Sequence, residues 1–205
     1  MTMKSQTELK FEKILKCGFH EILKPLGFLK KSNNFYCKNQ EIGQIINIQK
    51  STLYSRDKIE FTINIGLFLP EYWLGLTYNR DKNLPIYPSE TDCIIRKRIG
   101  ELANQLDTWY DIEEKTDEIA LINEMRSNIN LRILPFFEKI KTKESLLKFL
   151  DTEKLDLAPF GKLIVYSELL QFERAKKEYE NILKNSTNTD FLLTLEEYGE
   201  KYGII

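Results

Sequence analysis

Residue types that carry out catalysis or bind metals are sparse in this chain. A single histidine, His20, excludes any site with several histidine ligands. It falls on the polar side of the first predicted helix with no recognisable partner for acid–base catalysis, which favours a solvated surface histidine. The cysteines Cys17, Cys37 and Cys93 are too far apart in the sequence to match a metal-binding motif. We therefore expect no catalytic residues, no metal and no cofactor.

Two charged runs have alternative interpretations. A basic run at residues 96–98 could contact phosphate, but on a strand Lys97 points away from its two arginine neighbours, and basic residues also protect sheet edges. An acidic run could hold a divalent cation, but it lacks the glycine-containing loop of a calcium site. Acidic residues are also common where helices begin. The acidic run consists of Asp111, Glu113, Glu114, Asp117 and Glu118.

No nucleotide-binding glycine loop, serine-hydrolase elbow or zinc-protease helix motif occurs in the sequence. The most informative polar residues instead share one face of a predicted β-sheet. Polar and apolar residues alternate along residues 59–69 and along residues 42–53, the period of a sheet with one buried face. The polar side carries Asn47, Gln49, Ser51, Thr62 and Asn64, and a neighbouring predicted strand adds Arg96 and Arg98.

This composition is unusual for a sheet surface. Amide side chains are poor strand formers, and a merely solvated face usually carries Thr, Lys and Glu. Clustered amides and hydroxyls make several directional hydrogen bonds to a ligand or to a partner backbone. The polar face is therefore our candidate binding site, and the alternative is that a helix or water covers it.

The connection between the two segments predicts their register. If residues 56–57 form a two-residue turn, Gln49 lies opposite Asn64 and Asn47 lies opposite Gly66. The apolar residues of the two segments then also face one another, so the turn and the hydrophobic pattern agree.

The remaining elements follow from capping and breaking signals. Ser5 and Glu8 have capping-box spacing, which predicts a helix that Pro25 and Gly27 end. A hairpin turning at residues 32–33 and a further strand within residues 93–102 complete the sheet.

Helices dominate the rest of the chain. One should begin at Asp117 and be bent or ended by Pro135, and another should be capped by Thr142. Residues 158–183 read as a helical hairpin, and Thr194 with Glu197 has the spacing to cap a last helix.

This order predicts an α+β fold rather than alternating β and α units. We expect an N-terminal helix packed on an antiparallel sheet of about four to six strands, followed by an α-helical C-terminal region. The expected domains are a core at residues 1–140 and a helical extension at residues 141–205 that packs on the core.

Charge and composition limit the kinds of partner that the protein can have. The 30 basic and 31 acidic residues give a net charge of −1, which disfavours sequence-independent nucleic-acid binding but leaves room for a local basic patch. No apolar run approaches the ~18 residues that a membrane helix needs. An odd number of dispersed cysteines and a polar start without a signal region predict a cytoplasmic location. The oligomeric state is not predicted.

Four segments resemble the bacterial domain of unknown function 4304 family. They are Gly27-Phe28, Asn34-Phe35-Tyr36, residues 46–51 and residues 61–66, and the similarity covers residues 1–140. The resemblance implies a bacterial origin, a compact α+β core and no assigned activity, so no catalytic residue is carried over.

The C-terminal hairpin is weakly similar to one tetratricopeptide unit. Tyr166, Phe172, Ala175 and Tyr179 have matching spacings, but Leu163 stands where a small residue is expected. Repeat units need neighbours to bury their faces, so we interpret the hairpin as a helical cap rather than an array.

Two functions fit these observations. The first is a non-enzymatic protein-interaction or accessory module, for example a toxin-neutralising one, which rests on analogy at the level of fold. The alternative is an enzyme or a small polar ligand-binding protein, in which Arg96, Arg98 or Glu60 would converge with the amides in a pocket.

Overall fold

The computed structural model describes residues 4–38, 41–52, 55, 57–79, 82–152, 157 and 160–205. By backbone proximity the chain forms two compact units, one of residues 1–68 with 86–145 and one of residues 69–85 with 146–205. The expected domains, 1–140 and 141–205, remain a prediction, because backbone proximity does not test which parts fold independently.

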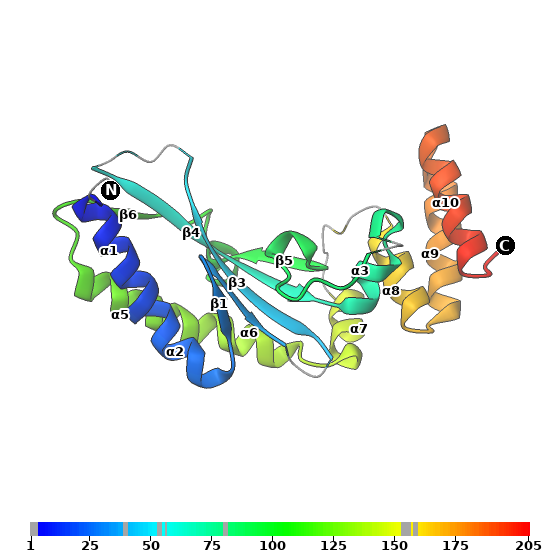
Figure 1. Cartoon of the computed structure of the whole chain (residues 1–205). Helices are drawn as coiled ribbons and strands as arrows, with labels where there is room; N and C mark the ends of the chain where they lie inside the picture. The colour runs from blue at the N-terminus through cyan, green and yellow to red at the C-terminus, as the bar shows by residue number, and fades with distance from the viewer. Residues whose placement is uncertain are drawn as a thin grey trace. The chain divides into compact units, whose positions relative to one another are not determined.

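The first unit is built on a six-stranded antiparallel sheet, which confirms the predicted α+β class (Figure 1). The strands follow the order β1-β2-β3-β4-β5, and β6 pairs with the opposite end of β4 from β5. Their bounds are β1 (Leu29–Lys31), β2 (Asn34–Cys37), β3 (Gly43–Lys50), β4 (Ile59–Phe68), β5 (Ile95–Arg98) and β6 (Tyr110–Ile112).

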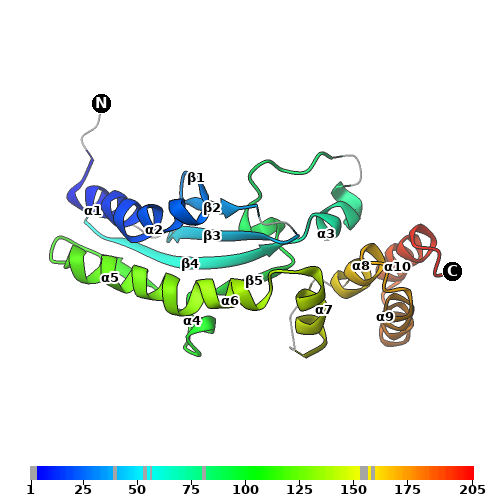
Figure 2. The ribbon, with the colours of Figure 1, turned by 90° about the horizontal axis from the view of Figure 1, so that it is seen from below.

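Two helical stretches lie side by side against one face of this sheet (Figure 2). The first runs through α1 (Gln6–Ile14), the π-helical η1 (Leu15–His20), α2 (Glu21–Leu23) and the 3-10 turn η2 (Lys24–Leu26). The second runs through α5 (Glu118–Asn128), the π-helical η5 (Ile129–Ile133) and α6 (Leu134–Lys139).

The predicted caps of these helices are confirmed. Ser5 and Glu8 form a capping box, and Gly27 ends η2 with a φ of 87°, a left-handed conformation that glycine adopts without strain. The Asp117 carboxylate accepts hydrogen bonds from the first turn of α5. Pro135 lies within the first turn of α6, directly after the π-helical segment, and the helix continues past it to Lys139.

The core lies between the helices and the sheet. On the covered face of β4, Ile59, Phe61, Ile63, Ile65 and Leu67 are at most 1% exposed. Phe11 of α1 meets Phe61 edge to face at 5.7 Å between ring centroids, and Phe19 of η1 stacks on Phe35 of β2 at 6.0 Å. Burying each such side chain contributes about 1.5–3 kcal/mol, so this interface fixes which sheet face the helices cover.

The predicted register of β3 against β4 is wrong by two residues. Asn47 lies opposite Asn64, and Gln49 lies opposite Thr62. The prediction placed Asn47 opposite Gly66 and Gln49 opposite Asn64. Since the shift is even, every side chain still lies on its predicted face.

The cause of the shift lies in the connection between the strands. At its tip the Ser55 N–H donates to the Lys58 carbonyl at 2.8 Å, as the two-residue turn predicts. The next bond toward the sheet runs from the Ser51 N–H to the Glu60 carbonyl, also at 2.8 Å. Three residues separate Ser51 from Ser55 and one separates Lys58 from Glu60. The connection is therefore two residues longer on the β3 side than on the β4 side, which shifts the pairing of β3 with β4 by two residues along its whole length.

The strand predicted within residues 93–102 is shorter than expected. It contains only β5, after the 3-10 turn η4 (Glu90–Asp92), and the chain then turns into α4 (Ile99–Leu102). The Glu101 carboxylate accepts from the Arg98 N–H at 2.7 Å, which caps α4 and ends the strand.

The second unit is helical. It contains α3 (Pro70–Gly75), the 3-10 turn η3 (Thr77–Asn79), most of α7 (Lys143–Thr152), α8 (Gly161–Glu168), α9 (Phe172–Asn185) and α10 (Thr189–Lys201). Thr142 caps α7, as predicted, and the predicted hairpin consists of α8 and α9 with its turn at Leu170. The predicted start of the last helix at Thr194 is wrong, because Asn188 caps α10 and Thr194 donates to the Asp190 carbonyl inside it.

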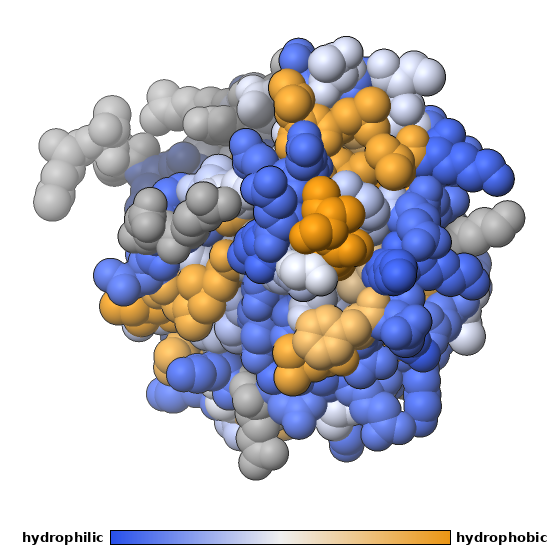
Figure 3. All heavy atoms as spheres, turned by 90° about the vertical axis from the view of Figure 1, so that its right-hand side faces the viewer, coloured by the Kyte–Doolittle hydropathy of each residue, from blue (hydrophilic) through white to orange (hydrophobic). Residues whose placement is uncertain are grey.

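The α9–α10 side of the second unit carries apolar side chains among hydrophilic ones (Figure 3). Leu183, Leu193 and Ile205 are half-exposed or more and line a cavity of about 300 Å³ with Tyr179. Among the described residues, every helix is too short or too polar to cross a membrane.

Gly66 of β4 is a position at which the structure predicts a measurable cost for one added methyl group. A Cβ atom there would lie 2.4 Å from the Cys93 Sγ and 3.1 Å from the Cys93 Cβ. We expect Gly66→Ala to lower the free energy of unfolding by about 1–3 kcal/mol, measured by urea denaturation. Adding Cys93→Ala removes the closest atom and should restore part of the loss. A Gly66→Ala variant as stable as the wild type would contradict this packing.

Candidate functional site

A row of polar side chains crosses the sheet on the face opposite the helices. Asn34 of β2, Asn47 of β3 and Asn64 of β4 are direct cross-strand neighbours. Lys31 of β1 and Arg98 of β5 occupy the two ends of the same row. Within the first unit the two long helical stretches pack on the other face (Figure 2), so neither of them covers this one; here the 3-10 turn η4 packs against β4.

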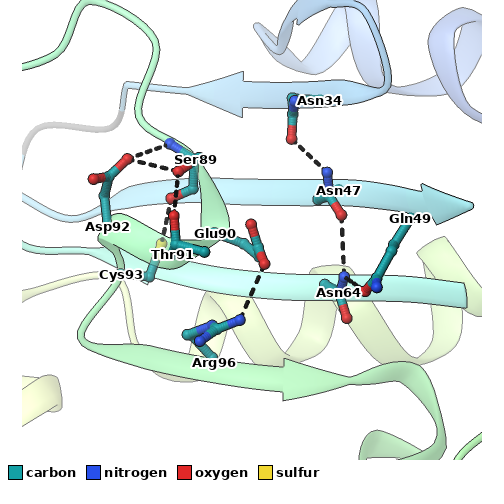
Figure 4. Close-up of polar contacts among 10 residues, drawn as sticks. All are labelled: Asn34, Asn47, Gln49, Asn64, Ser89, Glu90, Thr91, Asp92, Cys93 and Arg96. Atoms are coloured by element: carbon teal, nitrogen blue, oxygen red, sulfur yellow. Dashed lines mark hydrogen bonds and ion pairs between the residues drawn. The ribbon is translucent and has the colours of Figure 1, made fainter. Parts of the chain in front are cut away.

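Hydrogen bonds connect the amides of this row, and each bond across the strands is donated toward β2 (Figure 4). The Asn47 Nδ2 donates to the Asn34 Oδ1 at 2.7 Å, and the Asn64 Nδ2 donates to the Asn47 Oδ1 at 3.0 Å. Asn64 donates a second bond to the Gln49 Oε1 at 2.9 Å. Asn64 is buried, Asn34 and Asn47 are half-buried, and Gln49 is exposed. We call Asn34, Asn47, Gln49 and Asn64 the amide row.

The segment of residues 86–93 borders the amide row on one side. Its Cys93 packs on Gly66, and Glu90 accepts from the Arg96 guanidinium at 3.0 Å. Ser89 holds η4 in shape, because its N–H and hydroxyl both donate to the Asp92 carboxylate at 2.8 and 2.7 Å. Burial raises the pKa of the Cys93 thiol, which therefore stays protonated and unreactive.

The same segment continues over the β1–β2 edge. The Lys31 ammonium lies 5.3 Å from the centroid of the Tyr87 ring, a cation–π contact. Tyr87 and Ser89 line a cavity of about 30 Å³ with Asn34. That volume is about the share of one water molecule in the liquid, so it holds no organic ligand.

The segment of residues 106–109 borders the amide row on the other side. The Thr62 hydroxyl of β4 donates to the Thr108 carbonyl at 2.8 Å. Asp107 accepts hydrogen bonds from Arg98 and from the Trp109 indole, which lower the pKa of its carboxyl, Arg98 contributing most. The Arg98 guanidinium also lies 5.5 Å from the Trp109 ring centroid. Arg98 is therefore fixed by two partners.

The structure joins some of the predicted site residues and separates others. Asn47, Gln49 and Asn64 form one network, and Arg98 ends their row. Arg96 lies in the neighbouring row, opposite Gly66. Thr62 is fully buried, with its hydroxyl bonded to backbone, so it offers nothing to a ligand. Ser51 lies at the end of the sheet, paired with Glu60 rather than with the amides.

The other candidates from the sequence have structural partners. Asp111 pairs with Lys58 at 3.2 Å, Glu118 pairs with Lys13 at 2.6 Å, and Asp117 caps α5, so the acidic run is dispersed. Within the described residues, no three His, Cys, Asp or Glu side chains gather closely enough to hold a metal ion. His20 is half-buried rather than solvated, and the centroid of its ring lies 6.4 Å from that of the Phe35 ring.

Sequence reasoning missed Asn34 as a member of the site. Its strand was expected, but its place in the row depends on pairing with β3, and the sequence offers no turn of two residues to fix that pairing. The alternation in Asn34-Phe35-Tyr36 was the available signal, since it places the amide on the face opposite Phe35.

We expect Asn64→Asp to remove the two hydrogen bonds that Asn64 donates within the amide row. A carboxylate would face the oxygens of Asn47 and Gln49; Gln49 is exposed and can rotate, but Asn47 cannot without losing its bond to Asn34. The variant should lose about 1–3 kcal/mol of unfolding free energy at neutral pH, measured by urea denaturation.

The loss should also depend on pH. Burial and facing oxygens raise the folded-state pKa of the introduced carboxyl above its unfolded value of about 3.9. The folded state then holds the proton more tightly than the unfolded state does. The difference in unfolding free energy between the variant and the wild type should therefore grow as pH rises from the unfolded-state pKa through the folded-state pKa, and it should shrink at pH values below both. Gln49→Ala, at an exposed position, is the control and should cost less than about 1 kcal/mol. A pH-independent loss equal to that of Gln49→Ala would exclude this role for Asn64.

Comparison with known proteins identifies the family. No curated protein and no solved structure matches the chain significantly. The model of one family, described as Domain of unknown function (DUF4304), matches residues 19–139, a range that contains β1 to β6, the amide row and both bordering segments. The match covers more than half of the chain, and the protein belongs to the DUF4304 family.

Proposed function

We propose that this protein is a non-enzymatic binding module that recognises a protein partner across the amide row and its two bordering segments. The observation that carries the proposal is a fixed polar row with exposed apolar side chains on both sides. Ile86, next to Tyr87, is 82% exposed, and Leu106, next to the Arg98–Asp107 pair, is 90% exposed. Protein interfaces combine exposed apolar side chains with polar groups that make directional hydrogen bonds.

The residue types at the borders support a protein partner. Trp, Tyr and Arg dominate the energetics of protein interfaces, and Trp109, Tyr87 and Arg98 lie at the ends of this row. Arg98 is held by Asp107 and Trp109, so little side-chain entropy remains to be lost on binding. The row itself is held by its own hydrogen bonds, which makes the surface rigid before a partner arrives.

The alternative, an enzyme or a small polar ligand-binding protein that uses this face, has less support. It needs a concavity in which arginine and amide side chains converge. The cavity beside Asn34 has a volume of only about 30 Å³, and both arginines donate to carboxylates, Arg96 to Glu90 and Arg98 to Asp107.

The cellular setting is part of the proposal. The family resemblance supports a bacterial origin, and three unpaired cysteines suit the reducing cytoplasm. An accessory role such as toxin neutralisation would use a surface of this kind.

Substitution of Leu106 tests the proposal. Immobilised wild-type protein is used to capture partners from extracts of the source cells, and the partner identified is purified. We expect Leu106→Asp to weaken its binding about tenfold or more, measured by isothermal titration calorimetry, because a charge replaces an apolar contact. Gln49→Ala should weaken binding in the same direction.

Leu131→Asp is the matched control. Leu131 is 72% exposed but lies in η5, in the helical layer opposite the polar face. It should leave the affinity unchanged. A partner that binds all three variants as tightly as the wild type, or the failure of every captured protein to bind once purified, would refute the proposal.

A further inference from the structure

A cavity of about 730 Å³ lies on the helix side of the first unit. Side chains of α1 and η1 form one wall, and the β1–β2 turn at Ser32 and Asn33 forms the other. Lys30 and Lys50 also line it; they are the cross-strand partners of Phe35 and Phe61, so they lie on the face that the helices cover. The volume is within the range of about 300–1,000 Å³ that is typical of small-molecule sites.

The charge of the lining is positive although the chain as a whole is nearly neutral. Four lysines line the cavity against two glutamates, and both glutamates have local partners. Glu12 pairs with Lys4, and Glu8 accepts from the Ser5 N–H at 3.2 Å as part of the capping box. Among the described residues, Lys16 and Lys30 have no ion-pair partner and are exposed. Two amino groups are therefore available to an anion.

Neutral donors accompany these lysines. The carbonyl of Asn33 accepts from the Ile48 N–H at 2.9 Å, which ties the turn to β3 and fixes the backbone that carries the Ser32 hydroxyl and the Asn33 amide. Neither side chain has a hydrogen-bond partner in the described part of the chain. The lining thus offers hydroxyl and amide groups beside the lysines.

His20 adds a further donor. Its Nδ1 is buried without a hydrogen-bond partner among the described residues. A proton there would be an unsatisfied buried donor, so the neutral ring carries its proton on Nε2. Because His20 lines the cavity, this nitrogen is the one placed to donate to a ligand.

The apolar part of the lining limits what kind of anion fits. Phe11 and Leu15 contribute ring and aliphatic surface, and the Lys50 ammonium lies 4.3 Å from the Phe11 ring centroid. Lysine ammonium groups are effective phosphate ligands. The glutamates at the Lys4 end would repel an extended acidic chain, which favours a compact ligand.

We infer that this cavity is a binding site for a small phosphate ester. Lys16 and Lys30 bind the phosphate, the Ser32–Asn33 turn and His20 donate neutral hydrogen bonds, and the body of the ligand packs on Phe11 and Leu15. The site is separate from the amide row, so it does not depend on the protein partner proposed above.

Calorimetric titration of the full chain with AMP and with glucose 6-phosphate tests the inference, with adenosine and glucose as probes that lack phosphate. We expect at least one phosphate ester to bind, its phosphate-free counterpart to bind at least about tenfold more weakly, and added salt to weaken binding. Lys16→Glu combined with Lys30→Glu should reduce the affinity at least about tenfold. Lys16→Gln with Lys30→Gln is the milder pair if the charge reversal disturbs folding.

Lys38→Glu combined with Lys115→Glu is the charge-matched control. Both lysines are exposed, and neither lines the cavity, so this pair should leave the affinity unchanged. Equal loss in both double variants would overturn the assignment of the site. Failure of both esters to bind the wild type would overturn it too, as would equal binding of adenosine, or binding of single-stranded RNA in place of the esters.

Discussion

Pairing between β3 and β4 is the constraint on which the rest of the first unit depends. Side chains alternate along a strand, so one register sets the contents of both sheet faces at once. Asn47 opposite Asn64 continues the amide row on one face, and Lys50 opposite Phe61 places a lysine and an aromatic ring side by side on the other. The helices select the face, because Phe11 and Phe19 pack on Phe61 and Phe35. The polar face is then left for the segments 86–93 and 106–109, which are held to it by Cys93 on Gly66 and by Thr62 on Thr108.

Local signals were enough to predict what depends on neighbours in the sequence. The capping box at Ser5 and the helix end at Gly27 each report a contact within a few residues, and both were confirmed. The alternation along β4 identified the side chains that face the helices, but the strand is buried on both faces rather than on one. The register failed because it depends on the length of a connection, and the turn at Ser55 and Lys58 looks the same whether or not the β3 side is longer. The capping signal at Thr194 failed for a related reason, since Asn188 offers a better start six residues earlier.

Both candidate sites combine residues that the sequence keeps apart. Asn34 joins Asn47 and Asn64 only through two successive strand pairings, and Lys16 and Lys30 line one cavity only because a helix packs beside a hairpin. The net charge of −1 is a sum over the whole chain, so it does not reveal the local excess of lysines around the cavity. The sequence could show which residues lie on each face of the sheet. Side chains alternate between the faces with a period of two, so an error of two residues in the register leaves every side chain on its face. Which of those residues touch is a property of tertiary packing.

The two sites share strands but not side chains, and this decides how they should communicate. Asn34 and Phe35 are successive residues of β2 that point to opposite faces, as are Gln49 and Lys50 of β3. Energetic coupling between sites requires an element with two arrangements that each ligand biases differently. The shared strands have a single register, set by the buried core on one face and by the amide hydrogen bonds on the other. A phosphate ester bound beside η1 and a partner bound across the amide row should therefore act independently, and any coupling would have to pass through the helical layer or the bordering segments.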